Sequence, residues 1–241
     1  MHQLTLLPFP GPHIPEIVSG LTPSRDDRGT TVDMGAPGEW LHLLPPRTDT
    51  GQWCAHWIRQ VHGRKVLAVG DSDPAGAIGT ADALVTDRSG VLLVTRHADC
   101  APVLFWDPHR RALGLAHSGR RSTLANIVAV TIGALSERYG TVPRDLQVSI
   151  GAGIRACCYE IQEDVASEVR EANGGEYLTQ QQSGIYFDGP RMIADQCRDA
   201  GVEHVYGVLY GECTCCGPSH HFSYRRAGTL HRFAAIAGIT S

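Results

Sequence analysis

Apolar residues along the chain fall in short runs separated by turn residues, and most of these runs have the pattern of β-strands. Residues 91–95 form a continuous run of β-branched residues and leucine, which is typical of a strand buried on both faces. Residues 103–106 and 112–116 predict two more strands, joined by a hairpin turn at 108–111. Further strands are expected at residues 53–60, 66–69, 146–150 and 205–210, and residues 81–86 form a short apolar segment before a turn.

Helical spacing of apolar residues occurs in three segments of the second half. Residues 124–139 carry apolar side chains every three or four positions, and residues 163–172 and 190–200 predict two further amphipathic helices. Residues 1–50 hold many prolines, so only short strands and loops are expected in this N-terminal part. Strands and helices interleave without a regular βαβ rhythm, which predicts a single mixed α+β domain over residues 1–241.

Composition and charge exclude several classes of protein. Apolar residues make up 42% of the chain, which is enough for a full core. A net charge of −4 gives no electrostatic footprint for nucleic acid, and no apolar run approaches the roughly 18–20 residues of a membrane helix. The first residues lack the basic and apolar segments of a signal peptide. We therefore expect a cytoplasmic protein whose partner is a small molecule rather than nucleic acid or a membrane.

Potential metal ligands are abundant, with eight cysteines and twelve histidines. In a reducing compartment, thiols are more often buried, metal-bound or reactive than paired in disulfides. His62, Cys100 and His117 stand beside predicted strands and turns, and two imidazoles with one thiolate could bind a catalytic zinc ion that keeps one coordination position open. By themselves, ligands so far apart in sequence favour the simpler interpretation of a turn histidine, a small buried thiol and a core histidine.

Six short motifs, taken together and in order, point to a known family. They are QVHG at 60–63, ADALVT at 81–86, ADCAPV at 98–103, AHSGRR at 116–121, CCYE at 157–160 and FSYRR at 222–226. Over about residues 56–232, the chain resembles the purine nucleoside phosphorylase family once called multicopper polyphenol oxidases or laccase-domain proteins. The resemblance implies an α+β fold with a central β-sandwich and flanking helices, and a zinc site formed by His62, Cys100 and His117.

The same resemblance implies the reaction. It indicates phosphorolysis of adenosine, inosine or methylthioadenosine, and hydrolytic deamination of adenosine. The substrate partners are then a purine nucleoside and phosphate, and the cofactor is Zn²⁺ rather than copper. The residues expected to carry catalysis are the three zinc ligands together with Arg121, which matches an arginine of the family. Arg121 could anchor phosphate with its planar fork of donors, or it could form a structural salt bridge.

Departures from the family pattern point to a changed substrate. The family carries Ala-Gly-Trp-Arg-Gly after the second zinc histidine, whereas this chain has SGRRS at 118–122, so that Arg120 stands in place of an aromatic residue. The residues around Gly151 differ as well, and the N-terminal signatures are hardly visible within residues 1–50. A related small molecule of specialised metabolism is therefore also a candidate substrate.

Other cysteines and acidic residues near the motifs leave their roles open. Cys213 and Cys216 have the C-x-x-C spacing of a zinc site, but the family carries a similar stretch without structural zinc, which favours buried or pocket-lining thiols. Asp99 could orient a metal ligand or cap a turn. His97 is expected to be a neighbour of the site rather than a ligand.

Three other functions use the same residues. In a metal-free hydrolase, Cys100 would be the nucleophile and His117 its base, with His62 assisting. Copper-dependent phenol oxidation is a further alternative, but it needs a much larger set of histidines. The last alternative is a binding module that zinc stabilises and that catalyses no reaction.

Overall fold

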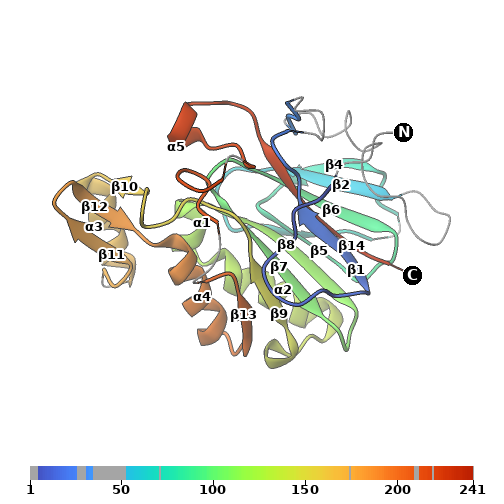
Figure 1. Cartoon of the computed structure of the whole chain (residues 1–241). Helices are drawn as coiled ribbons and strands as arrows, with labels where there is room; N and C mark the ends of the chain where they lie inside the picture. The colour runs from blue at the N-terminus through green and yellow to red at the C-terminus, as the bar shows by residue number, and fades with distance from the viewer. Residues whose placement is uncertain are drawn as a thin grey trace.

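Two β-sheets stacked face to face form the centre of the protein (Figure 1). The computed structural model describes residues 5–25, 31–34, 53–70, 72–173, 175–208, 212–218 and 220–240. The strands of the first sheet are, in spatial order, β1 (Ile17–Leu21), β14 (Phe233–Ile239), β6 (Val91–His97), β2 (Cys54–Arg59) and β4 (Gly76–Thr80). Those of the second are β13 (His204–Tyr206), β9 (Gln147–Ile150), β7 (Ala101–Asp107), β8 (Ala112–Ser118), β5 (Ala83–Thr86) and β3 (Val66–Ala68).

Strand β7 is apolar from Ala101 to Trp106 because both of its faces are covered. Leu104 and Trp106 point into the core between the two sheets, whereas Val103 and Phe105 point to the opposite face of their sheet, against helices. Successive side chains of a strand alternate between faces, so a strand covered on both sides needs apolar residues at every position. The strand at residues 91–95 was predicted to be buried on both faces, and this is confirmed in β6, where Val91 and Leu93 join one apolar cluster and Leu92 and Val94 another.

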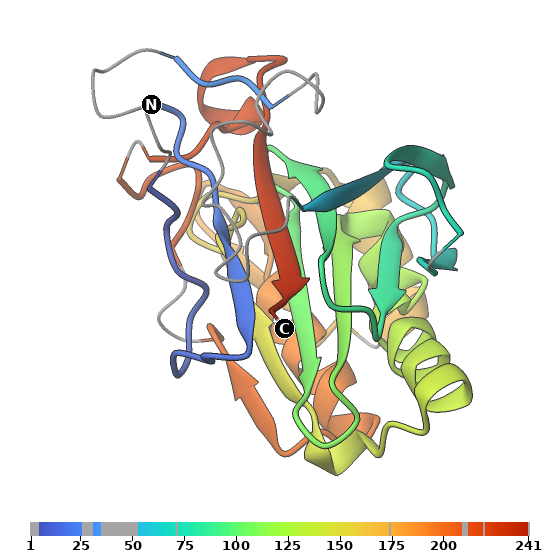
Figure 2. The same cartoon turned by 90° about the vertical axis from the view of Figure 1, so that its right-hand side faces the viewer.

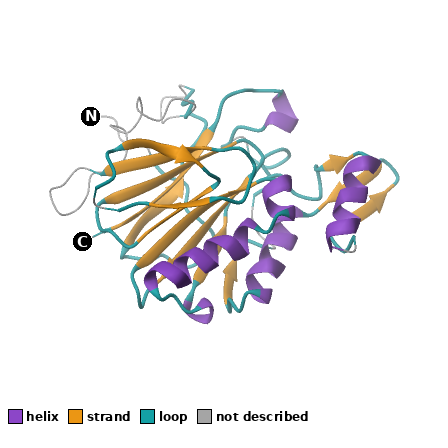
Figure 3. Ribbon diagram, turned by 180° about the vertical axis from the view of Figure 1, so that it is seen from behind, coloured by secondary structure: helices purple, strands orange, loops and turns teal. Residues whose placement is uncertain are grey.

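Helices cover the second sheet and form a third layer (Figure 3). These are α2 (Ile127–Tyr139) and α4 (Gly189–Asp199), whose apolar residues join the cluster that holds Val103 and Phe105. The helix expected at 124–139 is in fact two helices, because α1 (Arg120–Leu124) ends before Asn126. Asn126 adopts the left-handed conformation with φ 55° and caps α2 by accepting a hydrogen bond from the Ala129 amide. The Asn126 side chain thus bonds to the backbone of the next helix, and the chain breaks its helical conformation at this residue.

A smaller unit lies beside the sandwich (Figure 1). It comprises β10 (Glu160–Ile161), α3 (Glu163–Asn173), β11 (Leu178–Gln181) and β12 (Gly184–Phe187). Its apolar cluster includes Phe187 and also Met192 of α4, so the unit is packed onto the helical layer. The remaining short helices are η3 (Pro143–Asp145) and α5 (Tyr224–Ala227).

The expected fold class, an α+β domain with a β-sandwich and flanking helices, is confirmed. The pattern of apolar residues did not predict β14. This strand pairs with every residue of β1 and lies beside it in Figure 2. Much of the N-terminal part, residues 1–50, lies outside the described residues. The domain span of 1–241 stays a prediction. Every helix of the described chain is too short or too polar to cross a lipid bilayer.

Candidate metal centre

Three side chains that are distant in sequence meet at one end of the sandwich. The donor atoms of His62, Cys100 and His117 all lie within 4.8 Å of one another. The Sγ atom of Cys100 is 3.7 Å from Nε2 of His62, and the two imidazole rings have their centroids 4.8 Å apart. A tetrahedral zinc ion with usual bond lengths would hold such a sulfur and nitrogen about 3.6 Å apart. The three residues can therefore bind one metal ion.

Strand register explains how two of these residues meet. Strands β7 and β8 are antiparallel, and Pro102 pairs with His117 while Ala101 pairs with Ser118. Cys100 directly precedes β7, so it lies opposite Gly119, which directly follows β8. The hairpin therefore brings Cys100 and His117 together at the sheet end.

Asp82 brings the third residue to the same place. Its carboxylate is fully buried and accepts hydrogen bonds from the backbone amides of His62, at 2.9 Å, and Gly63, at 2.7 Å. The turn after β2 is thereby fixed, with His62 in the left-handed conformation at φ 58°. Because Asp82 precedes β5, which pairs with β8, this turn lies next to His117.

The same carboxylate orients His117. Nδ1 of His117 lies 3.0 Å from Oδ1 of Asp82, so the ring donates its Nδ1 proton and leaves Nε2 free for a ligand. Burial alone would raise the pKa of Asp82, but the hydrogen bonds from His117 and from the Gly63 and Val61 amides lower it. Asp82 was not among the predicted site residues, although it is a lone carboxylate at the start of the apolar run 81–86.

Cys100 and His117 favour each other's charged forms. Burial would raise the pKa of the Cys100 thiol, but the adjacent His117 lowers it. Burial would likewise lower the pKa of His117, but the Cys100 thiolate and Asp82 raise it. A metal ion binds the thiolate form of cysteine, so this arrangement prepares Cys100 as a ligand or as a nucleophile.

Gly119 has no side chain, and the side chains of Cys100 and His62 fill the space where one would lie. A Cβ atom at this position would lie 2.7 Å from Sγ of Cys100 and 2.8 Å from Cδ2 of His62. Gly119→Ala should therefore displace a ligand and weaken zinc binding by about 10- to 100-fold, as loss of a supporting contact does at other metal sites. Isothermal titration calorimetry of the metal-free protein would measure the change.

Gly133 in α2 provides the matched control, because a Cβ atom there meets no atom within 4 Å. Gly133→Ala should leave zinc affinity unchanged and raise the free energy of unfolding by about 0.5–1 kcal/mol, since alanine is the better helix former. Equal zinc affinity in both variants would contradict the tight packing inferred at Gly119.

A cavity of about 370 Å³ opens beside the three residues. His62 and Cys100 line it, whereas His117 is buried beneath them. Aromatic residues Tyr159 and Phe187 form part of the wall. The volume is within the usual range for small-molecule sites.

Arginines add positive charge to the cavity, but Arg121 is not one of them. Arg120, Arg225 and Arg232 line the cavity, whereas Arg121 is exposed and does not. Consecutive residues of a helix point in directions about 100° apart, so α1 can direct only one of this pair inward. Arg120 also forms an ion pair with Glu168 of α3. Arg120 therefore lines the cavity and Arg121 does not, and the role of Arg121 as a phosphate anchor stays a prediction.

Two other candidates surround the ligands without joining them. Asp99, at φ 82°, accepts hydrogen bonds from Thr214 Oγ1 and from the Arg225 amide, both at 2.7 Å. It thereby holds a C-terminal loop rather than a ligand. His97 is buried, with Nε2 2.8 Å from Thr95 Oγ1 and its ring 5.3 Å from that of His117. Burial and the nearby His117 keep the pKa of His97 well below its usual value, so the ring is neutral.

Comparison with known proteins extends these observations. The family described as multi-copper polyphenol oxidoreductase laccase matches residues 46–240. A purine nucleoside phosphorylase of Geobacillus stearothermophilus, YlmD, is 30% identical over 258 residues, covering 92% of this chain and 89% of its own. A purine nucleoside phosphorylase of Clostridium acetobutylicum is 34% identical over 177 residues and 71% of each chain. The crystal structure of YlmD from Geobacillus stearothermophilus superposes with a TM-score of 0.79 at 28% identity, over 96% of this chain and 94% of that one.

Proposed function

Because this chain belongs to the multi-copper polyphenol oxidoreductase laccase family, and relatives within it are named purine nucleoside phosphorylases, we propose that it is a zinc-dependent enzyme acting on purine nucleosides. The observation that carries the proposal is the meeting of His62, Cys100 and His117 at the edge of a cavity. Two imidazole nitrogens and one thiolate match the donor preference of zinc. When bound, zinc would supply a Lewis acid with one position open toward the cavity.

The cavity residues fit the parts of a nucleoside and a phosphate. Tyr159 and Phe187 offer apolar ring surface to a purine base. Arg225 lies over the Tyr159 ring at 5.3 Å and donates to the Glu160 carbonyl at 2.9 Å, so its guanidinium is already held in place. Arg120 is paired only with the largely exposed Glu168 among the contacts described, and a phosphate could replace that carboxylate.

The proposed main reaction is phosphorolysis. A phosphate oxygen forms a bond to the ribose carbon as the bond from that carbon to the purine nitrogen breaks, and the purine leaves with a proton. The arginines would hold the phosphate and offset its charge as it approaches. Deamination of adenosine is the proposed second reaction, in which water replaces the amino group of the base and ammonia leaves. A related small molecule is a third possibility for the substrate, since Arg120 adds a charge where the family pattern has an aromatic residue.

The neighbouring arginines give a second prediction with its own control. Arg120→Met should raise the KM for phosphate by about 10- to 100-fold, because it removes a charge-assisted hydrogen bond inside the cavity. Arg121→Met changes the same residue type one position later, outside the cavity, and should change this KM less than about twofold. Steady-state kinetics with inosine at varied phosphate would measure both. A larger effect at Arg121 would return the anchoring role to that residue.

A second candidate function rests on the geometry of Cys100. Its thiol is 3.7 Å from His62 Nε2, and its pKa is lowered by His117, as in a cysteine nucleophile with a histidine base. Copper-dependent phenol oxidation fits less well, since among the described residues only one ligand group contains histidine. A non-catalytic module would have no need of an open cavity beside the ligands.

One assay tests the proposed function. Purified protein loaded with zinc would be incubated with adenosine or inosine, with and without phosphate, and the products separated by chromatography. Release of adenine or hypoxanthine only when phosphate is present would support phosphorolysis, and conversion of adenosine to inosine without phosphate would support deamination. Absence of both reactions in zinc-loaded protein would contradict the proposal.

A further inference from the structure

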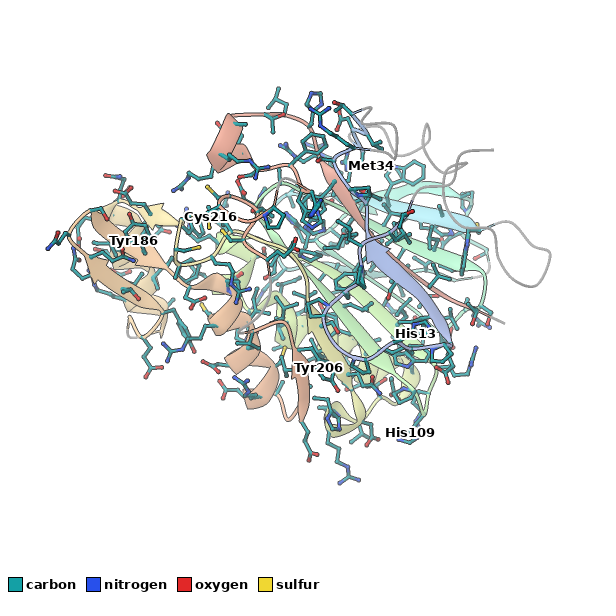
Figure 4. All side chains as sticks on the ribbon, in the orientation of Figure 1. His13, Met34, His109, Tyr186, Tyr206 and Cys216 are labelled. Atoms are coloured by element: carbon teal, nitrogen blue, oxygen red, sulfur yellow. The ribbon has the colours of Figure 1, made fainter. Side chains whose placement is uncertain are left out.

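A second group of potential metal ligands lies apart from His62, Cys100 and His117. The sulfur atoms of Cys157, Cys158, Cys213 and Cys216 all lie within 4.8 Å of one another. The first two follow β9, and the others belong to the loop between β13 and α5. Figure 4 shows sulfur atoms gathered near Cys216, between the sandwich and the smaller unit. We call these four residues the thiol cluster.

The loop that carries Cys213 and Cys216 has the form of a metal-binding turn. The Gly217 amide donates to the Cys213 carbonyl at 2.8 Å, and a Cβ atom at Gly217 would lie only 2.4 Å from that oxygen. The tight turn therefore requires glycine after the second cysteine. The backbone amides of Cys216, Arg155 and Cys215 form hydrogen bonds with the Cys213 sulfur. These amides stabilise a thiolate at the first position of the C-x-x-C sequence.

The other loop is held against this turn by backbone contacts. Gly153 and Cys213 form a parallel β-bridge, and the Thr214 amide donates to the Gly153 carbonyl at 3.2 Å. The chain then turns, with the Cys158 amide donating to the Arg155 carbonyl at 2.9 Å. This turn brings the consecutive side chains of Cys157 and Cys158 to the same point. The thiol cluster is thus assembled by backbone structure before any ion binds.

The chemistry of the cluster selects a soft ion with four sulfur ligands. A tetrahedral zinc ion with usual bond lengths holds its sulfur ligands about 3.8 Å apart. Sγ of Cys157 lies 3.4 Å from Sγ of Cys216, and the other pairs lie within 4.8 Å, so small shifts complete this geometry. A disulfide would use only two of the four thiols. Because Cys157 and Cys216 are exposed, an ion can reach the cluster from solvent.

We propose that Cys157, Cys158, Cys213 and Cys216 bind a second zinc ion, which is structural and fully coordinated by protein. This ion fastens the C-terminal loop to the loop that follows β9. From the sequence, buried or pocket-lining thiols were favoured here, because the family carries a similar cysteine stretch without structural zinc; the structure adds Cys157 and Cys158 as a second pair of sulfur ligands. The proposal is independent of the reaction that the enzyme catalyses.

The second ion also supports the cavity wall. Thr214, between the ligating cysteines, donates to Asp99 Oδ1 at 2.7 Å, and Asp99 directly precedes Cys100. Arg225, which lines the cavity, donates to the Cys158 carbonyl at 3.2 Å. The thiol cluster therefore acts as a positioning device for residues around the first metal centre.

Metal content of the full chain, purified in reducing buffer without chelator and supplied with zinc, tests the proposal. We expect two zinc ions per chain by inductively coupled plasma mass spectrometry. The double variant Cys157→Ser/Cys216→Ser should retain one, and Cys100→Ser should retain the other. Cys54→Ser changes a half-buried cysteine of β2 outside both groups and should retain two. A single zinc in the wild-type chain that is lost in Cys100→Ser would overturn the proposal.

Cobalt binding provides a test that does not require the double variant to fold. Cys100→Ser protein, stripped of zinc and titrated with Co²⁺ under reducing conditions, should bind one ion. It should then show the intense visible bands and near-ultraviolet thiolate charge-transfer absorption of a tetrahedral four-sulfur site. Absence of these bands would show that the cluster is not a metal site.

Discussion

Replacing Cys100 with serine should remove one zinc ion per chain and lower the turnover of purine nucleosides by more than about 100-fold, since loss of a mere supporting contact costs 10- to 100-fold. Cys100 is the single sulfur donor among the three residues that meet at the cavity. A serine hydroxyl does not ionise near neutral pH and is a poor ligand for zinc beside two imidazoles. The variant changes one atom, so the fold should be retained.

Zinc content and steady-state turnover, measured on the same preparation, would check this result. Cys54→Ser is the control, because Cys54 contacts His56 at 3.2 Å and lies outside the cavity lining. It should retain both zinc and turnover. If Cys100→Ser lost turnover but kept all of its zinc, Cys100 would be a nucleophile rather than a ligand.

Replacing Asp82 with alanine should lower the free energy of unfolding by about 3–5 kcal/mol, because it removes a buried charge that other groups depend on. Asp82 is fully buried and accepts hydrogen bonds from the His62 and Gly63 amides and from Nδ1 of His117. Among the described residues, Asp82 is the hydrogen-bond acceptor of all three donors. Zinc affinity should fall as well, since His117 and the turn at His62 lose their orientation.

Urea unfolding of zinc-free protein would measure the stability effect, and calorimetric zinc titration would measure the affinity. Asp87 provides the control at the other end of β5, where it is exposed and pairs with Arg88 at 3.2 Å. Exposed ion pairs contribute little, so Asp87→Ala should change the free energy of unfolding by less than about 1 kcal/mol. Similar effects for the two aspartates would contradict the supporting role assigned to Asp82.

The central strands could be predicted from the sequence, because a strand that is buried on both faces needs apolar residues at successive positions. The first four residues of β6 are apolar, as are most residues of β7 and β8, and such strands are typical of sheets covered on both faces. By contrast, β14 is rich in alanine and glycine, which have low strand propensity, so its sequence gave no strong signal. Its pairing with β1 joins the two ends of the chain and is set by tertiary contacts.

The site was predictable only in part. The order of the motifs indicated His62, Cys100 and His117, but their meeting depends on strand register and on the hydrogen bonds of Asp82, which are set by tertiary structure. The choice between Arg120 and Arg121 depends on the direction that α1 gives each side chain, and its start at Arg120 could not be read from the sequence. The thiol cluster joins two loops that are more than fifty residues apart, so spacing showed only half of it.

The central claim is that His62, Cys100 and His117 bind a single ion at the edge of the cavity. Anomalous X-ray diffraction at the zinc edge, from crystals of the zinc-loaded protein, tests it most directly. The account predicts a peak about 2.0–2.1 Å from Nε2 of each histidine and about 2.3 Å from Sγ of Cys100, with the fourth position facing the cavity. An anomalous map that shows no peak among these three atoms would contradict the account.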